Sequence, residues 1–136
     1  MKNQYISDEI QIRIRYGETD QMGIVYHGNY PLYLEMGRIE WLRKLGISYK
    51  KMEESGIILP VISLSLNFKK SAYYDDVINV KTQLKSKPTA KIEFDYEITN
   101  ERGEIITTAT VVLAFIDKNL NRPVRIPQHI LDAIYV

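Results

Sequence analysis

Cysteine is absent from the 136-residue sequence, and histidine occurs only as His27 and His129. Without cysteine the chain has no disulfide bond, no thiolate zinc site and no cysteine nucleophile. Two histidines are too few for a histidine-rich metal site. The sequence therefore predicts no bound metal ion.

Strong net charge and long apolar runs are also absent. The net charge of +1 gives no broad field that would attract a nucleic-acid backbone or an anionic membrane. No stretch approaches the roughly 20 apolar residues that cross a bilayer, and residues 1–9 carry no signal-peptide pattern. We expect a cytoplasmic protein with no nucleic-acid partner and no membrane span, in which a local group of cations meets any anionic ligand.

The length and composition are those of one globular domain. Hydrophobic residues make up 45% of the chain and charged residues 26%, and no internal repeat, low-complexity segment or linker interrupts it. Residues 1–136 are therefore predicted to form a single domain.

The pattern of apolar residues predicts one long helix among strands. Alternation predicts a strand at 10–16, and three glycines in residues 17–28 indicate a loop. Asn29, as a side-chain cap, and Pro31 are typical of a helix start, and Gly46 ends a helix predicted for 29–45. The other expected elements are a short helix at 48–54, strands at 62–68, 78–84, 92–98 and 105–115 in meander-like succession, and a helix at 127–134. This order predicts an α+β fold with the long helix against an antiparallel sheet.

Two charged residues fall on the apolar side of the predicted helix. Glu35 lies near the middle of the apolar arc, and Arg38 follows three positions later, within pairing reach. The arc comprises Tyr30, Leu32, Leu34, Ile39, Trp41, Leu42 and Leu45. Because a buried carboxylate needs a partner or a ligand, the two charges form either an ion pair at a subunit interface or part of a substrate pocket. In the second case Glu35 would position a water molecule and have a shifted pKa.

The loop before the helix is the best candidate for chemistry. Asp20 lies between glycines and close to a helix start, whose unpaired N–H groups suit a carbonyl oxygen that becomes anionic. A carboxylate there could attack an activated ester or take a proton from water. The simpler interpretation is that Asp20 only supports a turn. His27 is similarly either a general base or a structural residue.

Lys69, Lys70 and Ser71 form the clearest local basic cluster, at the end of a predicted strand. The cluster could meet the phosphates of a nucleotide-bearing substrate. Exposed lysines also protect strand ends from aggregation, and the composition alone favours that role.

The segment from Tyr16 to Tyr30, followed by that from Glu35 to Leu42, resembles the signature of bacterial acyl-CoA thioesterases of the 4-hydroxybenzoyl-CoA thioesterase type. The resemblance extends from Ile10 to about Ile116. It implies a hotdog fold, in which a five-stranded antiparallel sheet wraps around a long helix. It also implies a homodimer or homotetramer with active sites at the subunit interface, and hydrolysis of an acyl-CoA to the free acid and coenzyme A.

The resemblance assigns roles to individual residues. Asp20 matches the catalytic aspartate, which acts as nucleophile or as base for water, and the backbone N–H of His27 would polarise the thioester carbonyl. Tyr26 and Tyr30 would shape the pocket. Glu35 and Arg38 match charged helix positions of the family, with a role in chemistry or in the interface.

The same family match places Lys69, Lys70 and Ser71 near the edge that binds coenzyme A, although Ser71 replaces a proline that relatives often carry there. Coenzyme A is part of the substrate, so no separate cofactor is expected.

Other functions remain compatible with the sequence. A hotdog hydratase or dehydratase would act on an enoyl or hydroxyacyl thioester, and a non-catalytic module would only bind acyl-CoA or an acyl carrier protein. Acyl carrier protein, in place of coenzyme A, could also deliver the substrate to a thioesterase.

Overall fold

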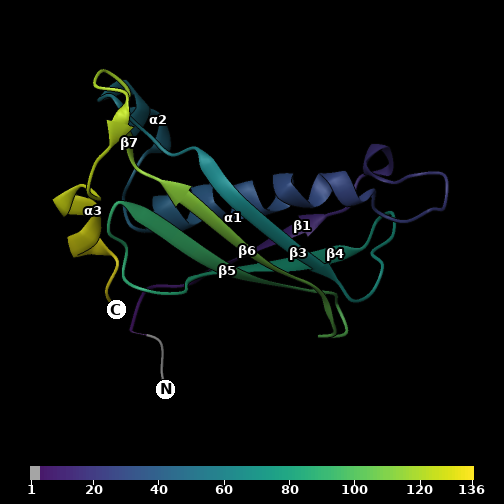
Figure 1. Ribbon diagram of the computed structural model, residues 1–136. Coiled ribbons are helices and arrows are strands. Elements are labelled where there is room, and N and C mark those ends of the chain that lie inside the picture. The colour runs from purple at the N-terminus through teal and green to yellow at the C-terminus, as the bar shows by residue number, and fades with distance from the viewer. Residues whose placement is uncertain (1–3) are drawn as a thin grey trace.

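A computed structural model describes residues 4–136 as one long helix packed on a five-stranded antiparallel sheet (Figure 1). The helix is α1 (Tyr30–Lys44), within one residue of its predicted bounds. The strands are β1 (Asp8–Arg13), β3 (Val61–Phe68), β4 (Val77–Leu84), β5 (Lys91–Thr99) and β6 (Ile105–Ala114). The prediction of an α+β fold with a helix wrapped by this sheet is confirmed.

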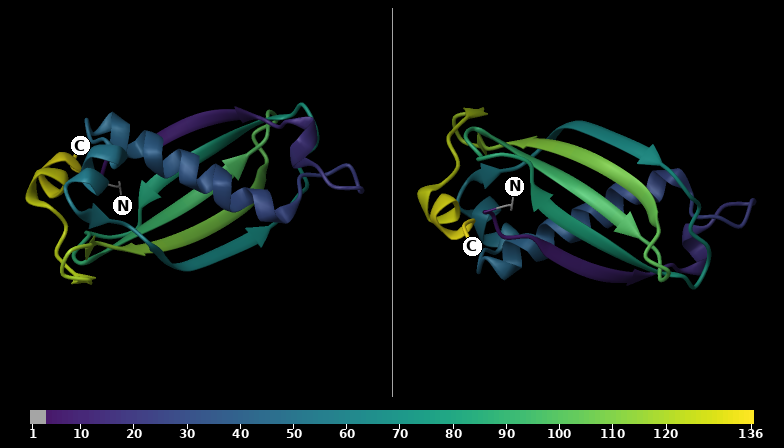
Figure 2. Two further views of the ribbon diagram at one scale, coloured as in Figure 1. Left: turned by 90° about the horizontal axis from the view of Figure 1, so that it is seen from above. Right: turned by 90° about the horizontal axis from the view of Figure 1, so that it is seen from below.

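The order of strands across the sheet differs from the predicted succession. The order is β1-β4-β5-β6-β3, so only β4, β5 and β6 form a meander. β3 pairs with β6 at one edge, and β1 pairs with β4 at the other. Residues 69–76 carry the chain across the end of the sheet from β3 to β4 (Figure 2). Alternation predicts which face of a strand is buried but carries no information on its neighbour, which is why the meander-like succession was wrong for β3.

Short elements close one end of the molecule. Helix α2 (Tyr49–Glu54) follows α1, and α3 (Gln128–Ala133) lies near the C-terminus, both as predicted. A small sheet joins β2 (Ile57–Ile58), β7 (Ile116–Asp117) and β8 (Arg122–Pro123), whose two-residue strands are too short to show a periodic pattern. No helix within residues 4–136 is long and apolar enough to span a membrane.

Helix α1 packs toward one side of the sheet, over β1 and β4. Its buried residues are Tyr30, Tyr33, Leu34, Gly37, Trp41 and Leu42. Leu32, predicted on the buried arc, is 57% exposed. The arc was therefore placed too far round the helix, because the side of α1 that faces β3 is not covered by the sheet.

Gly37 marks the closest approach of α1 to the sheet. A Cβ atom added at Gly37 would lie 2.5 Å from Oγ1 of Thr82 and 3.3 Å from Cγ1 of Val80. Thr82 is fully buried, and within residues 4–136 its hydroxyl has no hydrogen-bond partner. Glycine is therefore needed here for space and not for backbone freedom.

We predict that Gly37→Ala lowers the free energy of unfolding, since a clash worth about 1–3 kcal/mol outweighs a gain in helix propensity of at most about 1 kcal/mol. Thr82→Ala removes the clashing oxygen, so the double variant should recover at least about 1 kcal/mol relative to the sum of the single changes. Urea unfolding of all four proteins measures this coupling. Strictly additive effects would contradict the proposed contact.

Candidate active site

Glu18 holds the loop between β1 and α1 in place through both its backbone and its side chain. Its carbonyl oxygen accepts hydrogen bonds from the N–H of Tyr26 at 3.0 Å and from Nδ2 of Asn29 at 2.7 Å. Its carboxylate accepts from the Arg15 backbone N–H at 2.8 Å, the Arg15 guanidinium at 3.0 Å and the Tyr33 hydroxyl at 3.1 Å. Asn29 therefore does not cap α1 with its side chain, as predicted from the sequence, but ties the helix start to Glu18.

The charge of Glu18 is stabilised by these partners. Burial by itself raises the pKa of Glu18, but hydrogen bonds from Arg15 and Tyr33 lower it overall. Burial and the adjacent Glu18 carboxylate raise the pKa of Tyr33, so its hydroxyl stays protonated and can donate. Sequence reasoning missed Glu18; the only available signal was the opposite charge of Arg15 three positions earlier.

Asp20 lies on a tight turn inside this loop. Its backbone N–H donates to the Ile24 carbonyl at 2.8 Å, and its carbonyl accepts from the N–H of Gly23, which has a φ of +81°. Oδ1 of Asp20 accepts from the Met22 N–H at 2.8 Å. Asp20 thus supports a turn, and no donor among residues 4–136 occupies its second oxygen, Oδ2. The turn fixes the carboxylate and leaves one oxygen available.

A hollow of about 310 Å³ lies between this loop, the start of α1 and the end of β3; we name it the loop hollow. Its lining consists of Asp20, Met22, Ile24, Val25, His27, Tyr30, Phe68, Lys69, Lys70 and Ser71. The structure thus brings together six residues predicted for the site: Asp20, His27, Tyr30, Lys69, Lys70 and Ser71.

The start of α1 contributes backbone donors and aromatic rings to the loop hollow. His27 begins a 3-10 turn, His27–Asn29, which leads into α1, and no acceptor among residues 4–136 takes up its backbone N–H. The ring of Tyr30 lies 5.2 Å from that of Phe68 between centroids. The ring of Tyr26 packs on His27 at 4.5 Å, although Tyr26 does not line the hollow.

The three residues at the end of β3 differ in their charge environment. Lys70 pairs with Glu104, and this pairing, with hydrogen bonds from Asn100 and Arg102, lowers the pKa of Glu104 to about 2. Lys69 is exposed, and no ion pair within residues 4–136 includes it. Lys69 is therefore the cation of the predicted cluster that remains available to an anionic ligand.

Glu35 and Arg38 lie outside the loop hollow, farther along α1. Glu35 is exposed and not buried as predicted, because this side of α1 faces away from β1 and β4. Arg38 donates from a guanidinium nitrogen to the Tyr96 hydroxyl at 3.3 Å, and among residues 4–136 no ion pair joins Arg38 to Glu35. The two residues therefore form no ion pair with each other in the described part of the chain, and the two predicted roles, at a subunit interface or in a substrate pocket, stay predictions.

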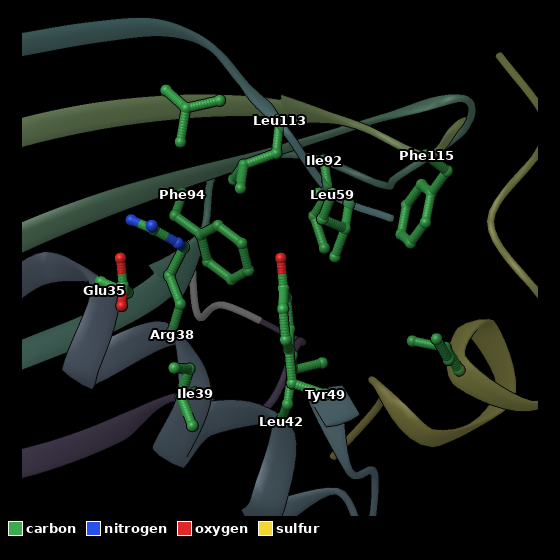
Figure 3. A pocket seen from close by; sticks show the side chains of 12 residues that line it. Glu35, Arg38, Ile39, Leu42, Tyr49, Leu59, Ile92, Phe94, Leu113 and Phe115 are labelled. Carbon is green, nitrogen blue, oxygen red and sulfur yellow. The ribbon is translucent and has the colours of Figure 1, made fainter. Parts of the chain in front are cut away.

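Both charges instead lie at one end of a second cavity, which we name the chamber (Figure 3). Its lining consists of Glu35, Arg38, Ile39, Leu42, Tyr49, Leu59, Val61, Ile92, Phe94, Leu113, Phe115 and Ile130. The chamber has a volume of about 200 Å³. Sequence reasoning did not predict it, because its walls come from α1, α2, α3 and three strands of the sheet.

Comparisons with known proteins agree with this architecture. Residues 14–134 match the thioesterase-like superfamily. The putative acyl-CoA thioesterase YneP of Bacillus subtilis is 36% identical over 115 residues, which cover 85% of this chain and 83% of that protein. A DHNA-CoA thioesterase from Staphylococcus aureus is 40% identical with a TM-score of 0.87, covering 93% of this chain and 85% of the other.

A third comparison extends the likeness of fold to a more distant protein. A 4-hydroxybenzoyl CoA thioesterase complexed with 4-hydroxybenzoyl CoA is 23% identical, with a TM-score of 0.85, and covers 94% of this chain and 98% of that one. At this identity the likeness shows the shared fold alone.

We predict that Glu18→Gln lowers the free energy of unfolding by about 1–3 kcal/mol at neutral pH, because hydrogen bonds to a charged acceptor are lost. The lowered folded-state pKa means that the carboxylate adds stability above its ordinary pKa, and that this stability is lost as the pH falls through the folded-state value. The difference in the free energy of unfolding between the variant and the wild type should therefore shrink between pH 7 and pH 3. The loss begins near the ordinary glutamate pKa of about 4.3, and urea unfolding across this pH range measures it.

Glu40→Gln is the matched control, because Glu40 forms an exposed ion pair with Arg43 on α1. Its effect should stay below about 1 kcal/mol at every pH. A gap between Glu18→Gln and the wild type that does not change with pH would contradict the charge-based role of Glu18.

Proposed function

The chain belongs to the thioesterase-like superfamily, and from this premise we propose that it is an acyl-CoA thioesterase that releases a carboxylic acid and free coenzyme A. The YneP relative and the DHNA-CoA thioesterase support this activity. The observation that carries the proposal is the loop hollow, which both Asp20 and His27 line. Among residues 4–136, Oδ2 of Asp20 and the backbone N–H of His27 have no hydrogen-bond partner.

The proposed chemistry uses these two groups at the thioester carbonyl. The His27 N–H, at the positive end of α1, stabilises the oxygen as it becomes anionic. Asp20 takes a proton from a water molecule whose oxygen bonds to the acyl carbon, or its carboxylate forms that bond and water then cleaves the anhydride. In either route the carbon–sulfur bond breaks and coenzyme A leaves as the thiolate. The proton that water gives up, held by Asp20 in the first route and released at cleavage of the anhydride in the second, converts the thiolate to the thiol. A thiolate whose conjugate thiol has a pKa near 8.5 is a good leaving group and needs little acid catalysis.

The other predicted residues have supporting roles in this proposal. Tyr30, in the lining of the hollow, and Tyr26, whose ring packs on His27, shape the acyl entrance. Lys69, with Lys70 and Ser71, meets the phosphates of coenzyme A. The protein uses no cofactor of its own and acts as a single domain. A cytoplasmic location belongs to the proposal, since coenzyme A thioesters are made and used inside cells.

A dimer through β3 is also part of the proposal. β3 is an edge strand whose large apolar side chains are exposed, among them Ile62 at 50% and Leu64 at 43%. A long, apolar, unprotected edge readily pairs with another strand. Two copies joined along β3 would form one continuous sheet and would place the open side of α1 beside the partner. Higher assembly to a tetramer would use other surfaces.

We predict that Asp20→Asn lowers kcat/KM for acyl-CoA by at least about 100-fold. Asparagine keeps an oxygen that can accept from the Met22 N–H, so the turn, the melting temperature and acyl-CoA binding by calorimetry should be largely unchanged. Release of free thiol measures turnover, and Asp132→Asn, an exposed residue of α3, is the matched control. Undiminished turnover in Asp20→Asn would remove this residue from the mechanism.

The same assay separates hydrolysis from hydration. With a 2-enoyl-CoA substrate, thiol release supports the proposed function. Loss of the enoyl absorbance without thiol release would overturn it in favour of a hydratase. Binding without either change would identify a non-catalytic module.

We predict that wild-type protein sediments as a dimer or a multiple of it, and that Ser65→Lys shifts it toward monomer. Ser65 lies near the middle of β3, where a two-fold axis would bring the two introduced lysines together. Gln11→Lys, on the opposite edge strand β1, is the control and should not change the assembly measured by analytical ultracentrifugation. An unchanged dimer in Ser65→Lys would place the interface elsewhere.

A further inference from the structure

The chamber lies beyond the residues assigned to catalysis, and its walls are apolar. Its charged residues, Glu35 and Arg38, lie at one end, while Phe115 lies at the other (Figure 3). Leu59, Ile92 and Leu113 are buried within its walls. A cavity of about 150 Å³ with such a lining can bind benzene, so the chamber, at about 200 Å³, can hold an apolar group.

Tyr49 presents both its ring and its hydroxyl to the chamber. The ring stands between Leu42 and Leu59 in Figure 3, and the hydroxyl interacts with the Leu59 backbone. At the charged end, Arg38 is held by the Tyr96 hydroxyl. Glu35 and Arg38 therefore lie at one end, which we name the mouth, and the interior offers apolar contacts apart from the Tyr49 hydroxyl.

A third, smaller hollow of about 130 Å³ adjoins the chamber on the side of the helix start. It is lined by Pro31, Leu32, Leu34, Glu35, Arg38, Val61, Leu64 and Val111. It shares Glu35, Arg38 and Val61 with the chamber, and it begins one residue after Tyr30, which lines the loop hollow. From the start of α1 toward its end, and from the end of β3 toward its start, the order is the loop hollow, the third hollow and the chamber.

We propose that the chamber receives the apolar end of the acyl group and that the enzyme favours straight acyl chains of about ten or more carbons. The proposal rests on the thioesterase function and specifies its substrate class. Burial of each further methylene is worth roughly a fourfold gain in binding. This gain applies only to carbons that pass the mouth at Arg38.

The chain length follows from the geometry of α1. Eight residues separate Tyr30 from Arg38, which corresponds to about 12 Å at a rise of about 1.5 Å per residue. Carbon–carbon bonds of about 1.5 Å in a zigzag advance by somewhat less than their length, so on the order of ten carbons span this distance. Acetyl and single-ring aromatic groups end before the mouth, whereas dodecanoyl and tetradecanoyl groups enter the chamber.

The test compares chain lengths in the wild type and in a variant with a filled chamber. Ile39 lines the chamber and is only partly buried, so Ile39→Trp adds bulk without replacing a core residue. We expect kcat/KM for tetradecanoyl-CoA to fall at least about tenfold, and that for hexanoyl-CoA to change less than about twofold. Ile39→Phe is the milder second variant if the first does not fold, judged by thermal unfolding.

Arg43→Trp is the matched control, because Arg43 lies one turn farther along α1 and does not line the chamber. It should leave the ratio of the two kcat/KM values unchanged. A wild type that prefers butyryl-CoA or benzoyl-CoA, or a ratio unaffected by both Ile39 variants, would overturn the chamber assignment alone. Absence of thiol release from every acyl-CoA in the wild type would overturn the proposed function itself.

Discussion

The off-centre position of α1, over β1 and β4, determines where this molecule is closed and where it is open. Gly37 permits this position, because its missing side chain lets the helix approach Thr82 and Val80 directly. On the covered side the packing is continuous and contains Leu34 and Trp41, both fully buried. On the other side, toward β3, the same helix leaves a seam, and the three hollows lie along it. The site is therefore a consequence of how a helix with one small residue sits on a twisted sheet.

Next to the loop hollow, Glu18 holds the structure in place, whereas Asp20 is the residue proposed to act on the substrate. Glu18 has most of its oxygen lone pairs occupied by Arg15, Tyr33, Tyr26 and Asn29, so it fixes the loop and the helix start relative to each other. Asp20, two positions later, uses one oxygen for its turn. A carboxylate held in this way needs no reorganisation before it meets a substrate, which is the physical basis of preorganised catalysis.

Much of this arrangement could be predicted from the sequence. Periodicity located α1, because a helix of this length repeats its pattern several times, and the family signature placed Asp20, His27 and Tyr30 together. The family match bears out the predicted thioesterase relationship. The environment of Glu35 could not be predicted, because it depends on which side of the sheet the helix covers. The place of β3 could not be predicted, because alternation carries no information on the neighbour of a strand. The chamber could not be predicted either, since residues as distant as Ile39 and Ile130 form its walls.

The pairing of the strands has a consequence for how the chain folds. β4, β5 and β6 are neighbours in sequence and in space, so they can form by local contacts. Among residues 4–136, β3 has only β6 as a partner and β1 has only β4. Both edges are therefore closed by contacts between distant parts of the sequence, the kind that slows folding. During synthesis β3, with its apolar side chains, remains without its partner until β6 has emerged, so the strand that is most exposed in the finished protomer is also exposed while the protein is being made.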